Sequence, residues 1–367
     1  MTYEAVRDLK TVGILREDRE KRITEIGVPM GIVAALIPST NPTSTVMYKS
    51  LICLKSGNAV IISSHPGAKN SILETCRVVE RAAREAGAPE GIVQCVTTPT
   101  PESTSALLRH PDIGIILATG GEAMVRAAYS SGNPALGVGP GNGPSYIERS
   151  ADVPLAIRRI FDSKTFDNGT MSPKVVGRSA EAIAAMAGVG VPAGTRVLIS
   201  PQTAVGKDNP YSREKLCPVL AFYVEENWER ACERCMELLF NEGRGHTMTI
   251  HSRNEEVIRE FALKKPVSRL LVNTPGALGG VGALTGLQPA LTLGCGAVGG
   301  SATSDNVGPM NLINIRRVAY GLKELDELRG GTAQSGEETR GEPAGVSVLS
   351  REDIEAISRA VIARLMG

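Results

Sequence analysis

Apolar and polar positions along the first 150 residues switch repeatedly between a strand-like and a helix-like period. Two short strand-like runs, 11–17 and 22–28, flank a charged turn and predict a hairpin ahead of the main fold. Five continuously apolar runs then alternate with four helical segments. The apolar runs are 31–38, 59–63, 92–96, 113–117 and 135–138, and the helical segments are 44–55, 69–86, 102–108 and 122–130. Continuously apolar strands joined by helices are typical of a parallel sheet covered on both faces. The pattern therefore predicts an α/β fold that binds its ligand, by default a nucleotide, at the carboxyl ends of the strands.

The same kind of alternation restarts after residue 150. Helical segments are expected at 151–163, 180–187, 227–240 and 255–263, and strands at 196–199, 219–224, 247–250 and 269–272. Residues 275–308 are too rich in Gly, Ser and Thr for regular elements, and such a composition indicates ordered loops near a site or an interface. We therefore expect a second α/β unit, completed by loops.

Composition narrows the possible partners. The chain carries 40 Lys plus Arg against 39 Asp plus Glu, so no charge excess attracts nucleic acid or an anionic membrane. No apolar run approaches the roughly 18 residues of a membrane-spanning helix, which favours a cytoplasmic protein without a membrane partner. Seven cysteines, an odd number scattered through a long chain, are typical of reduced thiols rather than a disulfide framework.

Three polar or glycine-rich turns follow predicted strands and are the candidate ligand contacts. Asn41 lies in a turn that opens a helix, where a side-chain amide can face a ligand, although Asn before Pro is also a common turn former. The turn Thr119-Gly120-Gly121 allows close backbone approach to phosphate or nicotinamide. Gly141 belongs to a second such loop, 137–142, which by itself is a weak signal.

The ordered set of motifs resembles the CoA-acylating acetaldehyde and propionaldehyde dehydrogenases of the aldehyde dehydrogenase superfamily. The resemblance runs from about residue 11 to residue 320, through the motifs at 37–43, 118–121, 137–142, 164–170, 212–219, 245–247 and 303–309. It implies a Rossmann-type NAD-binding domain, a catalytic α/β domain, NAD as hydride acceptor, coenzyme A as co-substrate, a short aldehyde as substrate and a homo-oligomer. No metal is implied.

The resemblance also assigns roles to single residues. Asn41 takes the place of the side-chain donor to the oxyanion, Thr119, Gly120, Gly121 and Gly141 line the dinucleotide loops, and Glu214 takes the place of the ribose-holding glutamate. Hydrolytic relatives carry a general-base glutamate before the glycine pair, whereas the loop at 137–142 has no carboxylate. Without a base to activate water, the thioester intermediate is not hydrolysed and persists until coenzyme A accepts the acyl group. The absence of a carboxylate therefore favours acyl transfer.

The chain departs from the family after Thr170, where the catalytic cysteine is expected. Either Ser172 occupies the place of the cysteine or the nucleophile segment is deleted, and we favour deletion because an unactivated serine is a poor nucleophile. Cys295, in a glycine-rich loop, is the reserve thiol, while Cys232 and Cys235 lie on an apolar helix face that favours core packing. We expect an impaired acylating dehydrogenase, or alternatively a non-catalytic nucleotide-binding or assembly partner of an active homologue. A glutamyl-phosphate reductase fits the motifs less well.

The C-terminal residues predict a separable helix on a linker. Ile354, Ile357, Val361 and Leu365 form one apolar stripe, and Ser350 with Asp353 resembles a capping box. Similar helices in acylating enzymes of catabolic microcompartments suggest a shell partner, and the alternative is a terminal helix that packs on its own core or on a sister subunit. The chain is expected to divide into six segments. These are a hairpin or oligomerisation segment (1–30), an NAD-binding domain (31–150), a catalytic domain shortened after residue 170 (151–310), a closing segment (311–328), a flexible linker (329–349) and a targeting helix (350–367).

Overall fold

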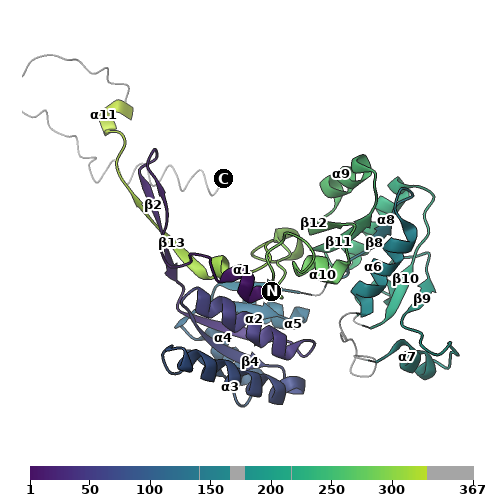
Figure 1. Ribbon diagram of the computed structural model, residues 1–367, viewed down its shortest axis with the longest axis horizontal. Helices are drawn as coiled ribbons and strands as arrows, with labels where there is room; N and C mark the ends of the chain where they lie inside the picture. Colours follow the sequence, from purple (N-terminus) through teal and green to yellow (C-terminus); the bar gives the residue numbers. More distant parts are fainter. Residues whose placement is uncertain (140, 166–177, 216, 329–367) are drawn as a thin grey trace, which may run out of the picture. The chain divides into compact units, whose positions relative to one another are not determined.

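The computed structural model of the chain describes residues 1–139, 141–165, 178–215 and 217–328 (Figure 1). Ser172, the predicted linker 329–349 and the predicted helix 350–367 lie outside these residues. The chain divides into two units, Met1–Ala319 and Tyr320–Gly367, and the second contributes the short helix α11 (Leu325–Leu328) to the described part. The finer division into six segments stays a prediction.

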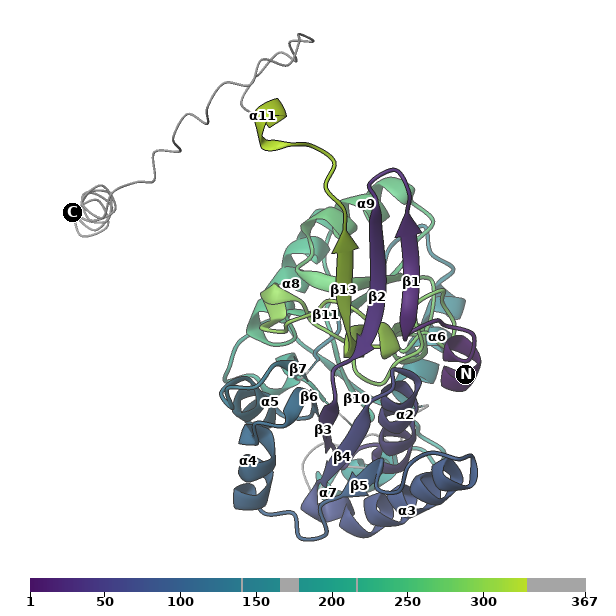
Figure 2. The same cartoon turned by 90° about the vertical axis from the view of Figure 1, so that its left-hand side faces the viewer.

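The predicted amino-terminal hairpin is present and has a third strand. After helix α1 (Thr2–Val6), strands β1 (Gly13–Asp18) and β2 (Ile23–Pro29) pair antiparallel. Strand β13 (Ile313–Ala319) pairs antiparallel with the other edge of β2, so residues nearly 300 positions apart lie side by side (Figure 2). The sequence interpretation treated this segment only as a closing stretch, because all but the first of its side chains are exposed and show no buried alternation.

The predicted parallel sheet is confirmed. Its strands are β3 (Ile32–Ile37), β4 (Ala59–Ser64), β5 (Val93–Cys95), β6 (Ile113–Thr119) and β7 (Ala135–Val138), in the spatial order β5-β4-β3-β6-β7. Every neighbouring pair runs parallel. The crossover helices are α2 (Pro42–Lys55), α3 (Lys69–Glu85), α4 (Pro101–Arg109) and α5 (Glu122–Tyr129), with the 3-10 turn η1 (Pro66–Ala68) before α3.

Both faces of this sheet are covered, which explains its continuously apolar strands. Val33, Ala35 and Ile37 pack toward α2 and α3, whereas Ala34 and Leu36 pack in a separate cluster with α4 and α5. Alternate residues of a strand point to opposite faces, so burial of both faces requires apolar side chains throughout. The sheet therefore presents its polar turns only at its ends.

The second α/β part of the chain is divided into two small sheets. One has the order β12-β11-β8, from β8 (Ser145–Ile147), β11 (Gly245–His251) and β12 (Val267–Val272). The other pairs β9 (Leu198–Pro201) with β10 (Val219–Phe222). The helices are α6 (Val153–Thr165), α7 (Ala180–Met186), α8 (Trp228–Asn241) and α9 (Glu255–Lys264), with the 3-10 turn η2 (Pro210–Ser212). Strand β8 was not predicted, because three residues are too few to show a period.

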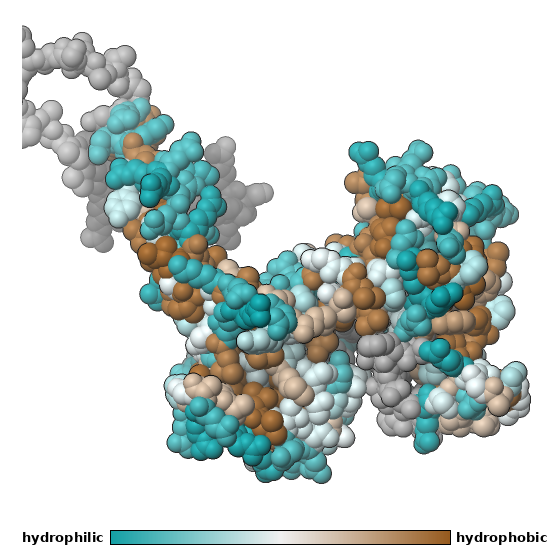
Figure 3. All heavy atoms as spheres, in the orientation of Figure 1, coloured by the Kyte–Doolittle hydropathy of each residue, from teal (hydrophilic) through white to brown (hydrophobic). Residues whose placement is uncertain are grey.

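Several apolar side chains of the two-stranded sheet and its flanks remain exposed. Ile199 and Phe222, which lie in the strands, are 54% and 51% exposed, and Val224, just after β10, is 79% exposed, whereas a covered α/β sheet buries such side chains. Figure 3 shows brown apolar atoms at the surface of this second α/β part, between teal polar ones. A two-stranded sheet is marginal by itself, so this part of the fold lacks cover that the first sheet has.

The glycine-rich stretch after β12 is largely loop, as expected, with three short helical turns. These are α10 (Gly276–Gly280), η3 (Ala297–Gly299) and η4 (Pro309–Leu312), so the expectation of no regular element at 275–308 was wrong for α10 and η3. Tyr48 Oη donates to Val307 O at 2.5 Å, and this bond holds the stretch against α2. No helix in the described part of the chain is both long and apolar enough to cross a membrane.

Candidate active site

Asn41 lies just beyond the carboxyl end of β3, immediately before α2, yet its side chain does not cap that helix. Its Oδ1 accepts hydrogen bonds from Thr45 Oγ1 at 3.0 Å and from Thr40 Oγ1 at 3.1 Å. Among the described residues no hydrogen bond uses Nδ2, so this donor is the end that can serve a ligand. The oxyanion role that the family resemblance implies for Asn41 stays a prediction.

The turn Thr119-Gly120-Gly121 follows β6, the neighbour of β3 in the sheet. Thr119 shares a hydrogen bond with Thr292, hydroxyl to hydroxyl at 3.0 Å, and Gly120 N donates to Val138 O at 3.4 Å. Gly121 precedes α5, and a Cβ built there meets no atom within 4 Å. A Cβ at Gly120 would lie 2.8 Å from Sδ of Met124, so the turn is open at Gly121 and closely packed at Gly120.

Gly141 and Glu214 are brought together although they are 73 positions apart. Gly141 N donates to Glu214 Oε1 at 3.0 Å, and this loop follows β7, the next strand after β6. A Cβ at Gly141 would lie 2.8 Å from Cδ2 of His246, so glycine permits the close approach of that ring. The predicted cofactor loop and the predicted ribose ligand therefore share one location.

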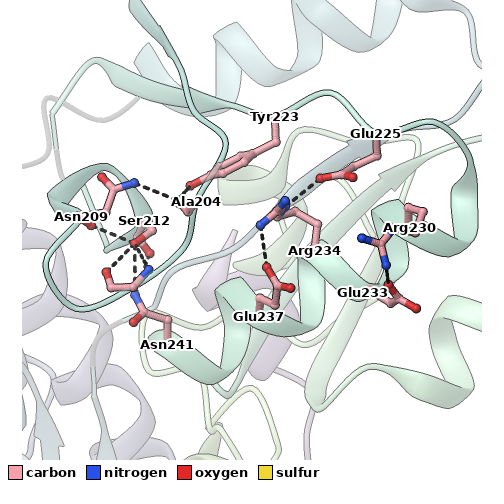
Figure 4. A network of polar contacts seen from close by, with 11 residues as sticks. Ala204, Asn209, Ser212, Tyr223, Glu225, Arg230, Glu233, Arg234, Glu237 and Asn241 are labelled. Atoms are coloured by element: carbon pink, nitrogen blue, oxygen red, sulfur yellow. Dashed lines mark hydrogen bonds and ion pairs between the residues drawn. The ribbon is translucent and has the colours of Figure 1, made fainter.

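A buried hydroxyl fixes the loop that carries Glu214 (Figure 4). Ser212 is 0% exposed, and its Oγ donates to Asn209 O and Gly206 O, each at 2.8 Å. Asn241 and Asn142 donate side-chain amides to Ser212 O at 3.1 and 2.9 Å. Glu242 accepts from Glu214 N as well. This network fixes the backbone around Glu214, whose carboxylate accepts from Gly141 N.

His246 and Arg269 join the glycine-rich loops behind Gly141. His246 Nδ1 contacts Thr247 Oγ1 at 3.0 Å, and burial, aided by the nearby Arg269 guanidinium, lowers the pKa of His246 to about 4. The imidazole is therefore neutral at pH 7. Arg269 is buried and donates to five acceptors, which are Thr247 Oγ1, His246 O, Gly294 O, Ser304 O and Asn306 Oδ1. Sequence reasoning missed Arg269, whose only signal was an arginine in an apolar strand.

Lys49 was also missed and lies under the same edge of the sheet. Its amine is fully buried and donates to Leu36 O at 2.8 Å and to Leu117 O at 2.9 Å, near the carboxyl ends of β3 and β6. Burial lowers the pKa of Lys49 to about 7. This amine therefore ties together the two strands that precede Asn41 and Thr119. A lysine within an otherwise buried helix was the available sequence signal.

Three of the described cysteines are not activated thiols. Burial raises the pKa of Cys53 and of Cys235 to about 12, and raises that of Cys295 despite the nearby Arg269. Cys232 and Cys235 are buried in one apolar cluster, as predicted. Among the residues that the structure describes, no thiol hydrogen-bonds to Asn41. We also predict that Asn41 and Glu214 serve the same nicotinamide. The hydrogen bonds described above join these two side chains to other residues and not to each other, so this stays a prediction.

The comparisons with known proteins agree on one family. The aldehyde dehydrogenase family matches residues 2–173. The chain is 39% identical over 369 residues to the bifunctional aldehyde-alcohol dehydrogenase AdhE of Escherichia coli (strain K12), with 86% of this chain and 41% of that protein covered. It thus spans less than half of the curated relative. The alignment is longer than this whole chain of 367 residues, so the relative has residues within it that have no counterpart here.

Solved structures give a more complete match. A probable aldehyde dehydrogenase from Listeria monocytogenes EGD-e is 54% identical, with a TM-score of 0.88. The match covers 89% of this chain and 83% of the Listeria chain. An acetylating aldehyde dehydrogenase from Geobacillus thermoglucosidasius is 43% identical, with a TM-score of 0.86 and coverage of 88% and 82%. Because these similarities extend over most of both chains, the protein belongs to the aldehyde dehydrogenase family, next to acetylating members.

Proposed function

We propose that this chain is an NAD-binding member of the CoA-acylating aldehyde dehydrogenases whose oxidation step is impaired because the nucleophilic cysteine is missing. The observation that carries the proposal is the hydrogen bond between Gly141 and Glu214, in the loop that follows β7 at the carboxyl edge of the sheet. Carboxyl ends of parallel strands are where α/β folds bind nucleotides.

The residues present fit a dinucleotide. Glu214 is partly buried, and its carboxylate lies against the glycine loop through Gly141 N, where an acceptor group would suit a ribose diol. NAD, when bound, supplies the hydride acceptor. The chain's own groups would orient it through Glu214 and the two glycine loops, while the Asn41 amide donates to the oxygen of the aldehyde. The loop at 137–142 holds no carboxylate that could activate water, which favours transfer to coenzyme A over hydrolysis.

Three observations support the loss of the nucleophile segment. The alignment to AdhE contains residues without counterpart here, and the thiols of Cys53, Cys235 and Cys295 are held protonated by burial. The second α/β part is split into small sheets with exposed apolar side chains. The same observations favour the second candidate, a non-catalytic partner that binds nucleotide or assembles with an active homologue.

Removal of the Glu214 carboxylate should weaken NAD binding without unfolding the protein. We expect Glu214→Ala to raise the Kd for NAD about tenfold or more, since a hydrogen bond from a hydroxyl to a charged group contributes roughly 1.5–3 kcal/mol. Isothermal titration calorimetry measures this directly. Glu233→Gln, an exposed carboxylate on α8, is the control and should bind as the unaltered protein does. Equal affinity in Glu214→Ala and the control, with circular dichroism unchanged, would remove Glu214 from the site.

We also propose that residues 350–367 dock the protein onto the shell of a bacterial microcompartment. The support is the apolar stripe of Ile354, Ile357, Val361 and Leu365 in the sequence. A fluorescent protein fused to residues 350–367 should co-purify with intact shells. Changing Ile357 and Val361 to Glu should abolish recovery, whereas Glu352→Gln with Arg359→Gln should retain it. Equal recovery of both variants would argue against docking through the stripe.

A further inference from the structure

A buried amine meets a buried thiol in the second α/β part of the chain. Lys265 is the residue that ends α9, and Cys232 lies 33 positions earlier, on α8. Lys265 Nζ donates to Cys232 O at 2.9 Å and also to Cys232 Sγ, so the amine and the thiol are in direct contact. Lys265 is 6% exposed and Cys232 is 7% exposed. The contact therefore places a nucleophilic nitrogen against an oxidisable sulfur and links two helices.

The surroundings of this amine are unusual for a buried lysine. Besides Cys232, Lys265 Nζ lies 4.5 Å from the centroid of the Phe261 ring, which is a cation–π contact. Within the described part of the chain no carboxylate forms an ion pair with Lys265. The neighbouring Lys264 is exposed and pairs with Glu260 at 2.6 Å. Buried lysines are normally paired with an opposite charge, so a thiol partner in place of a carboxylate requires another explanation.

We propose that Cys232 and Lys265 form a reversible sulfenamide, a crosslink through one S–N bond, when the protein reacts with hydrogen peroxide. In the first step the Cys232 sulfur attacks one peroxide oxygen, the O–O bond breaks, and the departing hydroxide takes the thiol proton to become water. In the second step the Lys265 amine, after its ammonium proton has passed to solvent, attacks the sulfur of the sulfenic acid. The S–O bond breaks, and the oxygen leaves as a second water with one amine proton. The sulfur is oxidised by two electrons, one peroxide is reduced to two waters, and a thiol reductant reverses the oxidation.

The geometry selects Cys232 over the next thiol on the same helix. Cys235 belongs to the same apolar cluster, and burial raises its pKa to about 12, although the Lys265 ammonium opposes this shift. Among the described residues it is the sulfur of Cys232, and not that of Cys235, that accepts a hydrogen bond from the amine. Cys53 is fully buried and serves as an internal reference for an unreactive thiol. None of these residues is assigned to the proposed NAD site, so the inference does not depend on the proposed function.

The experiment treats the folded full chain with hydrogen peroxide, blocks the remaining thiols with N-ethylmaleimide and digests the protein with trypsin without reduction. Trypsin cleaves after lysine and arginine but not before proline, so Cys232 falls in peptide 231–234 and Lys265 in peptide 265–269. We expect mass spectrometry to find these two peptides joined, with two hydrogens fewer than their sum and no added oxygen. The free peptide 231–234 should be lost to the same extent. Dithiothreitol should separate the joined peptides, and Cys53 should stay reduced throughout.

Unfolding tests whether the fold brings the two groups together, and it needs no variant. In concentrated urea the same peroxide treatment should oxidise Cys232 without joining the peptides, because the two residues are 33 positions apart in the sequence. An equal yield of the joined peptide in urea would overturn the proposal. Oxidation of Cys232 in the folded protein with peptide 265–269 left free would also overturn it. A joined peptide that retains an oxygen atom would overturn the assignment of an S–N bond.

Two matched lysine variants separate the steps. Lys265→Arg keeps the positive charge but has no primary amine, so oxidation should stop at the sulfenic acid of Cys232, which dimedone labels. Lys264→Arg changes the exposed neighbour and should give the joined peptide as the unaltered chain does. Cys235→Ala should also retain the crosslink. Loss of the joined peptide in Cys235→Ala, with the fold intact by circular dichroism, would show that the wrong thiol had been assigned.

Discussion

Purified protein supplied with NAD, coenzyme A and propionaldehyde is expected to produce NADH roughly a thousandfold or more slowly than an intact acylating enzyme. The oxidation requires a covalent bond between a thiolate and the aldehyde carbon before hydride can leave. In the proposed function Asn41 would donate to the oxyanion, but the thiols of Cys53, Cys235 and Cys295 are held protonated by burial. The absorbance of NADH, followed at equal protein concentrations, measures the rate.

The acetylating enzyme of Geobacillus thermoglucosidasius is the positive control, and a rescue experiment tests the cause. Insertion, after Thr170, of a segment that carries a nucleophilic cysteine should restore NADH production, because the proposed oxyanion donor Asn41 and the proposed cofactor loops are present in this chain. NAD that binds without any rescue of turnover would favour the non-catalytic assembly partner. Turnover of the unaltered chain at ordinary enzyme rates would contradict the deletion interpretation, and Ser172→Ala and Cys295→Ala would then identify the substitute nucleophile.

Arg269→Met is expected to lower the free energy of unfolding by about 3–5 kcal/mol. Methionine can occupy the space of the aliphatic part of the arginine side chain. It has no N–H groups, however, so the five atoms that accept hydrogen bonds from the Arg269 guanidinium would lose that donor. These acceptors belong to the segments around His246, Gly294 and Ser304, so the loops behind Gly141 lose their common support. Urea unfolding followed by the fluorescence of Trp228, the single tryptophan, measures the change.

Two matched variants show whether burial and geometry cause the loss. Arg126→Met removes a guanidinium whose ion pair with Glu122 is exposed, and it should change stability by less than about 0.5 kcal/mol. Arg269→Lys keeps the charge but cannot present the forked donors, so it should recover only part of the stability. If Arg269→Met lowered the free energy of unfolding no more than Arg126→Met does, the hydrogen bonds of Arg269 would not stabilise the fold.

Much of the candidate site was predictable from sequence because each part follows a strand. Asn41 and the turn Thr119 to Gly121 were placed at the carboxyl edge, and the parallel order of β3 and β6 confirms that location. The bond between Gly141 and Glu214 was not predictable from the pattern, since no local period relates residues 73 positions apart. The family resemblance named both residues, but only the fold shows that they touch.

The sequence by itself determined the parallel sheet, its covering helices and the hairpin. A strand buried on both faces is apolar throughout, and a strand buried on one face alternates apolar and polar residues, so both can be recognised from the spacing of apolar residues. Only the tertiary structure decided that β13 joins β2 and that Arg269 gathers five acceptors. These arrangements rest on hydrogen bonds between distant segments. A backbone strand pairs through groups that every residue carries, and a buried side chain finds its partners only after the chain has folded, so neither leaves a local pattern in the sequence.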